Sequence, residues 1–194
     1  VQTYFEALTS FERLTQLPVA GIGLDFVHGA KENLKALQKF GFPKNKTLSL
    51  GIINGRDIWS ANLAEVVSTI STVKQLSQVE NLWISSSCSL QHVPVSKDVE
   101  KKLSLELWDH LAFADEKIRE IAHITYFIKK GEWLKEGIVK QSLQVIEALA
   151  THPIRKNKDV LHAVNTLKAD DFTRDVPFAE RQQIQKEALQ LPDY

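Results

Sequence analysis

The sequence predicts an α/β protein whose core is a sheet of parallel strands. Short apolar runs alternate three times with longer stretches of helical periodicity. Alternation at this interval is typical of right-handed βαβ units, because each return to the same end of a parallel sheet needs a crossover of about a dozen residues. Hydrophobicity is nearly continuous in GIGLDFV and LSLGIIN, which indicates strands covered on both faces. We therefore expect a parallel sheet under helices.

Four runs have the length and composition of buried strands. They are rich in β-branched and aromatic residues, are bounded by Gly, Pro, Asn or Ser, and cover residues 1–5, 21–27, 48–54 and 82–86. Helical patterns fill the intervals, over residues 9–16, 30–40 and 61–78. In the last of these, Leu63, Val66 and Ile70 belong to one apolar face. We expect Trp59 and Trp83 to lie in the core.

After residue 96 the pattern becomes purely helical. The stretch LELWDHLAFADEKIREIAHITYFIKK, residues 105–130, carries an apolar stripe that includes Leu111 and Ile118. It predicts one long helix that ends near Gly131.

The remaining residues are predicted to form shorter helices. We expect two of them over residues 133–152 and 157–167, separated by Pro153, and a mostly polar helix over residues 178–191. This tail is a candidate linker or docking element between domains.

Composition restricts the classes of partner and the compartment. The 24 basic and 24 acidic residues among 194 cancel, so the chain carries no electrostatic footprint for nucleic acid or an anionic membrane. No apolar run approaches the roughly 18 residues that a membrane-spanning helix needs. A single cysteine cannot form an internal disulfide, and no secretory leader opens the sequence, so we expect a cytoplasmic location. Because Val1 begins a strand-like run without a lead-in, we also expect a segment of a longer protein.

Polar residues gather where the predicted strands end. In parallel α/β folds the carboxyl ends of the strands carry the residues that face ligands. The candidates for substrate binding at this rim are Asp25, His28, Asn54, Arg56 and Cys88. Arg56 follows Asn-Gly, a pair that allows positive φ in a turn. Its guanidinium is expected to bind either a neighbouring carboxylate, Asp25 or Asp57, or an anionic ligand.

Cys88 admits two interpretations. With His28 or His92 as base and Asp25 as orienter, its thiol could act as a nucleophile. Alternatively, it is a small buried hydrophobe, as free cysteines usually are. Zinc binding is not expected, because a zinc site needs several ligands and the chain has neither a second thiol nor a His-Glu-x-x-His helix.

Several strings of the sequence resemble one known family, in the same order. The amino-terminal domain of cobalamin-independent methionine synthase, also called 5-methyltetrahydropteroyltriglutamate homocysteine methyltransferase, is similar to YFEALTSFERLTQLPVAGIGLDFVHG, LSLGIINGRDIWSANL, LWISSSCSLQHVPV and LAFADEKI. The resemblance runs from residue 1 to about residue 128. It resumes in RQQIQKEALQLP, which is similar to the linker helix before that family's catalytic domain.

The resemblance implies a partial (βα)8 TIM barrel, made of the last four parallel strands of an amino-terminal barrel with their helices, and followed by extra C-terminal helices. Residues 1–130 would be the second half of that barrel, residues 131–177 a helical extension, and residues 178–194 a linker helix toward a catalytic barrel that this chain lacks. In the family that second barrel holds the zinc and the homocysteine. No catalytic residue, metal or cofactor is therefore expected here, and Cys88 is interpreted as the remnant of a zinc ligand after an ancient duplication of the barrel.

The resemblance also implies a function and a set of partners. The parent transfers a methyl group from 5-methyltetrahydrofolate polyglutamate to homocysteine and so makes methionine, while this segment is expected to be an inactive scaffold. Its expected partners are the missing first half of the barrel and the catalytic barrel, and its open strand edges predict self-association. The alternative is a free-standing α/β enzyme with a nucleophilic site made of Cys88, a histidine and Asp25.

Overall fold

The computed structural model describes residues 1–130 and 136–192. The chain divides into two compact units, residues 1–150 and residues 151–194. The first unit contains the sheet and all the candidate rim residues, and the second contains only helices.

The sheet has three parallel strands in the order β1-β2-β3. They are β1 (Gly21–Asp25), β2 (Thr47–Ile53) and β3 (Asn81–Ser86), which confirms three of the four predicted runs. The fourth run, residues 1–5, is present only as an isolated parallel bridge between Gln2 and Gly23. It goes no further because the chain turns away at Phe5, where φ is 80° and the N–H donates to the Asp25 carboxylate instead of to a strand.

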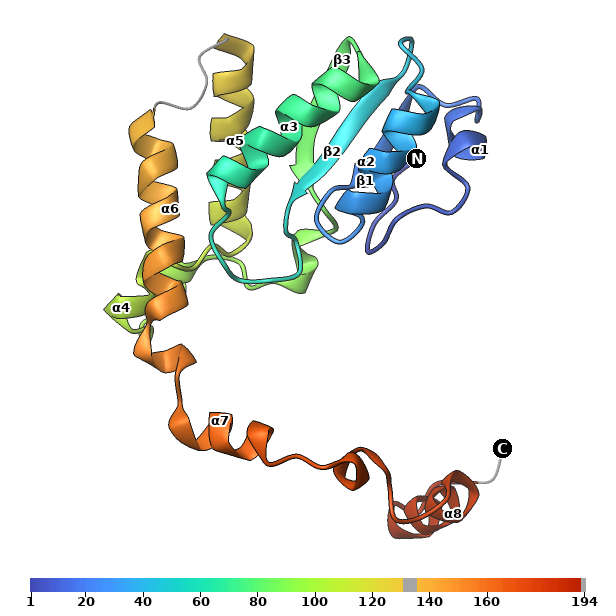
Figure 1. Ribbon diagram of the computed structural model, residues 1–194, viewed down its shortest axis with the longest axis vertical. Helices are drawn as coiled ribbons and strands as arrows, with labels where there is room; N and C mark the ends of the chain where they lie inside the picture. Colours follow the sequence, from blue (N-terminus) through green and yellow to red (C-terminus); the bar gives the residue numbers. More distant parts are fainter. Residues whose placement is uncertain (131–135, 193–194) are drawn as a thin grey trace. The chain divides into compact units, whose positions relative to one another are not determined.

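Helices cover one face of this sheet. The first unit contains α1 (Phe11–Thr15), α2 (Ala30–Phe40), α3 (Leu63–Ser77), α4 (Leu105–Trp108), α5 (Ala114–Lys130) and α6 (Glu136–Thr151), with 3-10 turns at Leu90–His92 and Lys97–Val99. Both α2 and α3 lie against the same face, which agrees with their place as crossovers between successive parallel strands (Figure 1). The side chain of Asn62 caps α3 by accepting a hydrogen bond from the Glu65 N–H, as expected for an asparagine at this position.

The predicted long helix over residues 105–130 is two helices, α4 and α5, so that prediction was wrong in this respect. Between them, Leu111 forms an antiparallel bridge with Trp59, and the Ala112 N–H donates to the Ile58 carbonyl oxygen at 2.9 Å. Backbone groups that make this bridge cannot also make the hydrogen bonds of a helix. The predicted end of the helix at Gly131 lies outside the described residues.

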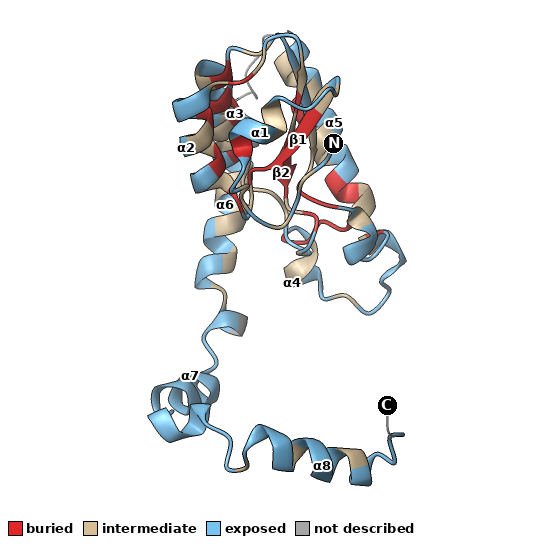
Figure 2. Ribbon diagram, turned by 90° about the vertical axis from the view of Figure 1, so that its right-hand side faces the viewer, coloured by how far each residue is buried: buried red, intermediate tan, exposed pale blue. Residues whose placement is uncertain are grey.

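The core lies between the sheet and its helices, where buried residues are concentrated (Figure 2). Strand residues that are almost fully buried there are Ile22, Leu24, Leu48 and Leu50, and the helices contribute Leu37, Ile70, Val73 and Ile124. Burying each such side chain stabilises the fold by roughly 1.5–3 kcal/mol.

The other face of the sheet carries small and polar residues and is not covered in the same way. Gly21, Thr47, Ser49 and Trp83 line a hollow of about 480 Å³ on this face. Trp83 is 66% exposed and Trp59 is 41% exposed, so the prediction that both lie in the core was wrong. The apolar runs of β1 and β2 indicated two covered faces because glycine counts as apolar, yet it has no side chain that needs cover.

The second unit consists of helices whose apolar side chains face solvent. It contains α7 (Lys158–Asn165) and α8 (Phe178–Ala188), with 3-10 turns at Pro153–Arg155 and Ala169–Phe172. Neither α7 nor α8 buries a residue, and Val160 and Val164 on α7 are each 57% exposed. Within the described ranges, no helix combines the length and the apolar character that crossing a membrane requires.

Candidate functional site

Asp25 lies at the carboxyl end of β1 and is fully buried. Its Oδ2 accepts a hydrogen bond from the Phe5 N–H at 2.8 Å, and its Oδ1 accepts from the N–H groups of Val27 at 2.7 Å and His28 at 2.9 Å. These bonds tie the segment before β1 to the turn after it. Asp25 therefore organises the rim, and the exposed side chain of His28 extends from the turn that Asp25 fixes.

The turn after β2 is organised by Asn54 and Asp57. Asn54 donates through Nδ2 to Asp57 at 2.8 Å and accepts through Oδ1 from the Arg56 N–H at 2.9 Å. Gly55 is needed for close approach, since a Cβ there would lie 2.8 Å from the Cys88 carbonyl oxygen and 2.9 Å from its Sγ. The expected positive φ is not the reason for this glycine, because among the described glycines only Gly41 has one.

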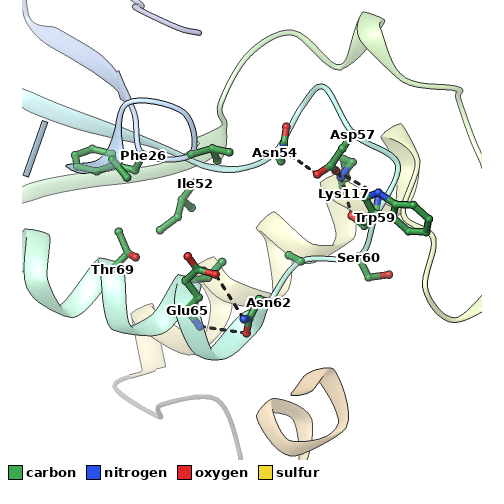
Figure 3. Close-up of a pocket in the computed structure, with 14 residues that line it drawn as sticks. Phe26, Ile52, Asn54, Asp57, Trp59, Ser60, Asn62, Glu65, Thr69 and Lys117 are labelled. Atoms are coloured by element: carbon green, nitrogen blue, oxygen red, sulfur yellow. Dashed lines mark hydrogen bonds and ion pairs between the residues drawn. The ribbon is translucent and has the colours of Figure 1, made fainter. Parts of the chain in front are cut away.

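Lys117 is a residue of this region that the sequence did not reveal. Its side chain, 1% exposed, reaches from α5 and donates through Nζ to Asp57 Oδ1 at 3.1 Å and to the Trp59 carbonyl oxygen at 3.0 Å (Figure 3). The predicted apolar stripe contained Ile118, yet Ile118 is 54% exposed and Lys117 faces inward. The spacing of Lys117, Ile121 and Ile124 would have placed a lysine on the buried face.

A cavity of about 240 Å³ lies between the end of β2 and the start of α3. Phe26 and Ile52 form an apolar wall, and Glu65 and Thr69 of α3 stand across from them (Figure 3). Lys117 also lines the cavity, but its ammonium group already has two acceptors in Asp57 and Trp59.

Arg56 is exposed and packs its guanidinium over the ring of Phe5, with Cζ 4.6 Å from the ring centroid. The ring of His92 lies 5.6 Å from the Phe5 ring, and that of Tyr4 lies 4.9 Å from it. The described residues contain no ion pair between Arg56 and either Asp25 or Asp57, so the first expectation for Arg56 is not met, and the second, an anionic ligand, stays a prediction.

Cys88 is 5% exposed, and its Sγ donates to the Ser89 carbonyl oxygen at 3.7 Å. Burial raises the pKa of this thiol, and it outweighs the opposing hydrogen bond with Ser87; the charges of Asp25, which raises the pKa, and Arg56, which lowers it, have smaller effects. Within residues 1–130 and 136–192 the structure records no hydrogen bond between Cys88 and a histidine, and Asp25 serves backbone N–H groups. The structure therefore does not assemble the Cys88–His–Asp25 nucleophile.

Two carboxyl groups of α5 are buried with opposite consequences. Burial alone would raise the pKa of Glu116, but hydrogen bonds from the Phe113 and Lys97 N–H groups and from the Ser96 hydroxyl hold it below its ordinary value. Burial raises the pKa of Glu120, whose Oε1 accepts from the Ala61 N–H at 2.9 Å. Both groups brace loops against α5.

The part of the chain that the structure describes brings together no group of three or more His, Cys, Asp and Glu side chains that could hold a metal ion. The described residues of the rim thus do not fit a zinc site of three or four ligands.

Comparisons with known proteins place these observations in a family. Residues 1–78 match the family model described as Cobalamin-independent synthase, N-terminal domain. Over 193 residues the chain is 40% identical to the 5-methyltetrahydropteroyltriglutamate--homocysteine methyltransferase of Bacillus cereus (strain G9842), a match that covers 99% of this chain and 25% of that protein. The protein of the same name from Bacillus cytotoxicus is 43% identical over 199 residues, with the same coverage of 99% and 25%. The chain spans about a quarter of the length of these curated relatives. The resemblance that the sequence predicts is confirmed, and the chain is related over nearly its whole length to one part of the cobalamin-independent methionine synthases.

Proposed function

We propose that the chain is a non-catalytic part of a methyltransferase that transfers a methyl group from 5-methyltetrahydrofolate polyglutamate to homocysteine and so makes methionine. The observation that carries this proposal is the identity of about 40% over 99% of the chain to proteins named for that reaction. The single reduced cysteine and the lack of a spanning helix in the described residues support a cytoplasmic place for it.

The chain would build one arc of a (βα)8 barrel. Its strands are parallel and adjacent in chain order, α2 and α3 lie on one face, and residues 1–3 extend the arc beside β1. The Thr3 N–H donates to the Gly23 carbonyl oxygen at 3.0 Å, so residues 1–3 lie where a fourth strand would pair with β1. In such a barrel the face of the sheet away from α2 and α3 would point inward, where the side chains of all the strands meet.

A scaffolding role is supported by the contacts of the polar groups at the rim, which lie within the chain itself. Asp25 accepts backbone N–H groups, Asp57 accepts from Lys117 and Asn54, and Cys88 is a buried thiol with a raised pKa. These groups hold turns in place, and the remaining parts of the parent would supply the zinc, the homocysteine site and the closing strands.

A chimera tests this function. The matching quarter of the Bacillus cereus relative is replaced by residues 1–194, and methyl transfer to homocysteine is assayed. We expect activity in the chimera and none from the 194-residue chain alone. A folded chimera without activity, or a chain that methylates homocysteine by itself, would overturn the proposal.

A further inference from the structure

Arg56 presents an uncommitted cation at the end of the sheet. Its guanidinium makes no ion pair with any described acid, although several acids are close in the sequence or in space. Asp25 accepts three backbone N–H groups, and Asp57 is bonded to Asn54 and Lys117. Glu6 is exposed and forms no ion pair with Arg56. The five N–H donors of the guanidinium are therefore available to a ligand.

The platform under this cation is held rigidly. Phe5 has φ of 80°, a conformation that costs a non-glycine residue on the order of 1–3 kcal/mol and persists only where the surroundings enforce it. The enforcement is the 2.8 Å hydrogen bond from the Phe5 N–H to the buried carboxylate of Asp25. The backbone of Arg56 is fixed as well, because the Arg56 N–H donates a hydrogen bond to Oδ1 of Asn54. Both members of the stack are therefore positioned by groups that belong to the sheet.

Segments far apart in the sequence converge at this stack. Phe5 precedes β1, Arg56 follows β2, and His92 follows β3, with its ring 5.6 Å from that of Phe5. This is the end of a parallel sheet at which ligands bind in α/β folds.

We propose that Arg56, Phe5 and His92 form a binding site for a carboxylate attached to a flat apolar body. A guanidinium matches the two oxygens of a carboxylate with two parallel hydrogen bonds, and the rings of Phe5 and His92 beside it favour an anion with an apolar body over inorganic phosphate. The exposed ring of Tyr4, 4.9 Å from that of Phe5, enlarges the apolar surface beside the cation. His92 can add a hydrogen bond through its imidazole.

This site stands apart from the methyltransferase role, because it follows from the contacts of Arg56 alone and a chimera can be active with or without it. An exposed site of this size should bind a fragment-sized anion with a Kd on the order of 1 mM.

The test is a saturation-transfer NMR titration of benzoate against the 194-residue chain, a measurement that tolerates self-association. Acetate and inorganic phosphate are titrated in parallel. We expect saturable binding of benzoate and at least fivefold weaker binding of acetate, which lacks the ring, and of phosphate. Arg56→Lys and Arg56→Gln should each weaken benzoate binding at least fivefold, because neither offers a charged fork of donors.

Arg13→Lys is the matched control, since Arg13 is an exposed arginine on α1, and it should leave benzoate binding unchanged. Both Arg56 variants change an exposed side chain, and circular dichroism verifies that they fold. Non-saturable benzoate binding, equal binding by the Arg56 variants, or tighter binding of phosphate than of benzoate would overturn the proposed site.

Discussion

The carboxylate of Asp25 is removed from water, and backbone N–H groups replace its hydration. Three of them converge on its two oxygens, and its own carbonyl oxygen accepts from Asn33 Nδ2 at 2.8 Å. A buried charge is tolerable only when its lone pairs are satisfied in this way. The residue that sequence reasoning selected as a ligand or orienter thus acts on the backbone around it.

Replacing Asp25 by Asn should destabilise the protein by about 1.5–3 kcal/mol, because an amide nitrogen cannot accept the bonds that one carboxylate oxygen accepts. Urea denaturation followed by circular dichroism measures the change. Asp98→Asn, at an exposed position, should shift the free energy of unfolding by less than about 0.5 kcal/mol. Equal effects of the two substitutions would show that the hydrogen bonds accepted by the Asp25 carboxylate do not stabilise the fold.

Cys88 should behave as an inert thiol. Burial raises its pKa, and the residue is 5% exposed, so little thiolate is present near neutral pH and reagents reach it poorly. Alkylation by iodoacetamide at pH 7.5 should be at least tenfold slower in the folded protein than in urea, as mass spectrometry can follow. Fast alkylation of the folded chain at neutral pH would instead favour the thiol-enzyme alternative.

At the level of elements, hydrogen bonds to the Glu116 side chain hold the loop that precedes α5. Its carboxylate accepts from the Ser96 hydroxyl at 3.0 Å, the Phe113 N–H at 3.0 Å and the Lys97 N–H at 3.3 Å. One side chain therefore fixes both the start of the helix and the 3-10 turn at Lys97–Val99.

This arrangement predicts a pH dependence. The pKa of Glu116 is lower in the folded state than the ordinary glutamate value of about 4.3, so its stabilisation is present above that value and is lost as the pH falls through the lowered pKa. Glu116→Gln should lower the free energy of unfolding at pH 7 and lower it less at pH 3. Denaturation at both values measures this, with Glu12→Gln on the exposed side of α1 as control. A deficit that is the same at both pH values would show that the carboxylate charge is unimportant.

The elements also show how far the sequence could lead. The three strands and the helices α2 and α3 follow from hydrophobic periodicity, because each presents a regular face to one core. The interruption at residues 109–113 did not follow, since it depends on pairing with the distant residues around Trp59. The spacing of Lys117 with Ile121 and Ile124 could have placed it on the buried face, but its acceptors could not be predicted, because they lie about sixty positions earlier in the chain. The sequence predicted that the rim candidates lie at the ends of the strands. It could not predict their hydrogen-bonding partners, which only the fold brings together.

On the scale of the whole molecule, the sheet in the first unit is open. Its strand β3 has no buried residue, and Trp83 exposes 66% of its surface beside the hollow that Gly21 and Ser49 line. Open strand edges and an exposed apolar residue favour pairing with another chain.

The chain should therefore self-associate when it is isolated from the rest of its parent. Sedimentation velocity over a hundredfold range of concentration should show a rising sedimentation coefficient, and Trp83→Lys should weaken the association. Ile118→Lys, at a residue of α5 that is 54% exposed, serves as the matched control and should leave the association unchanged. A chain that stays monomeric at every concentration would contradict both the open edges and the barrel arc.

The order β1-β2-β3 has a consequence for how the chain is made. Each strand pairs with the one synthesised just before it, and the segment at Gln2 has already emerged when Gly23 arrives. No pairing in the sheet has to wait for a segment still inside the ribosome. The arc can thus grow one βα unit at a time during translation, and the edge at β3 is the last to be made.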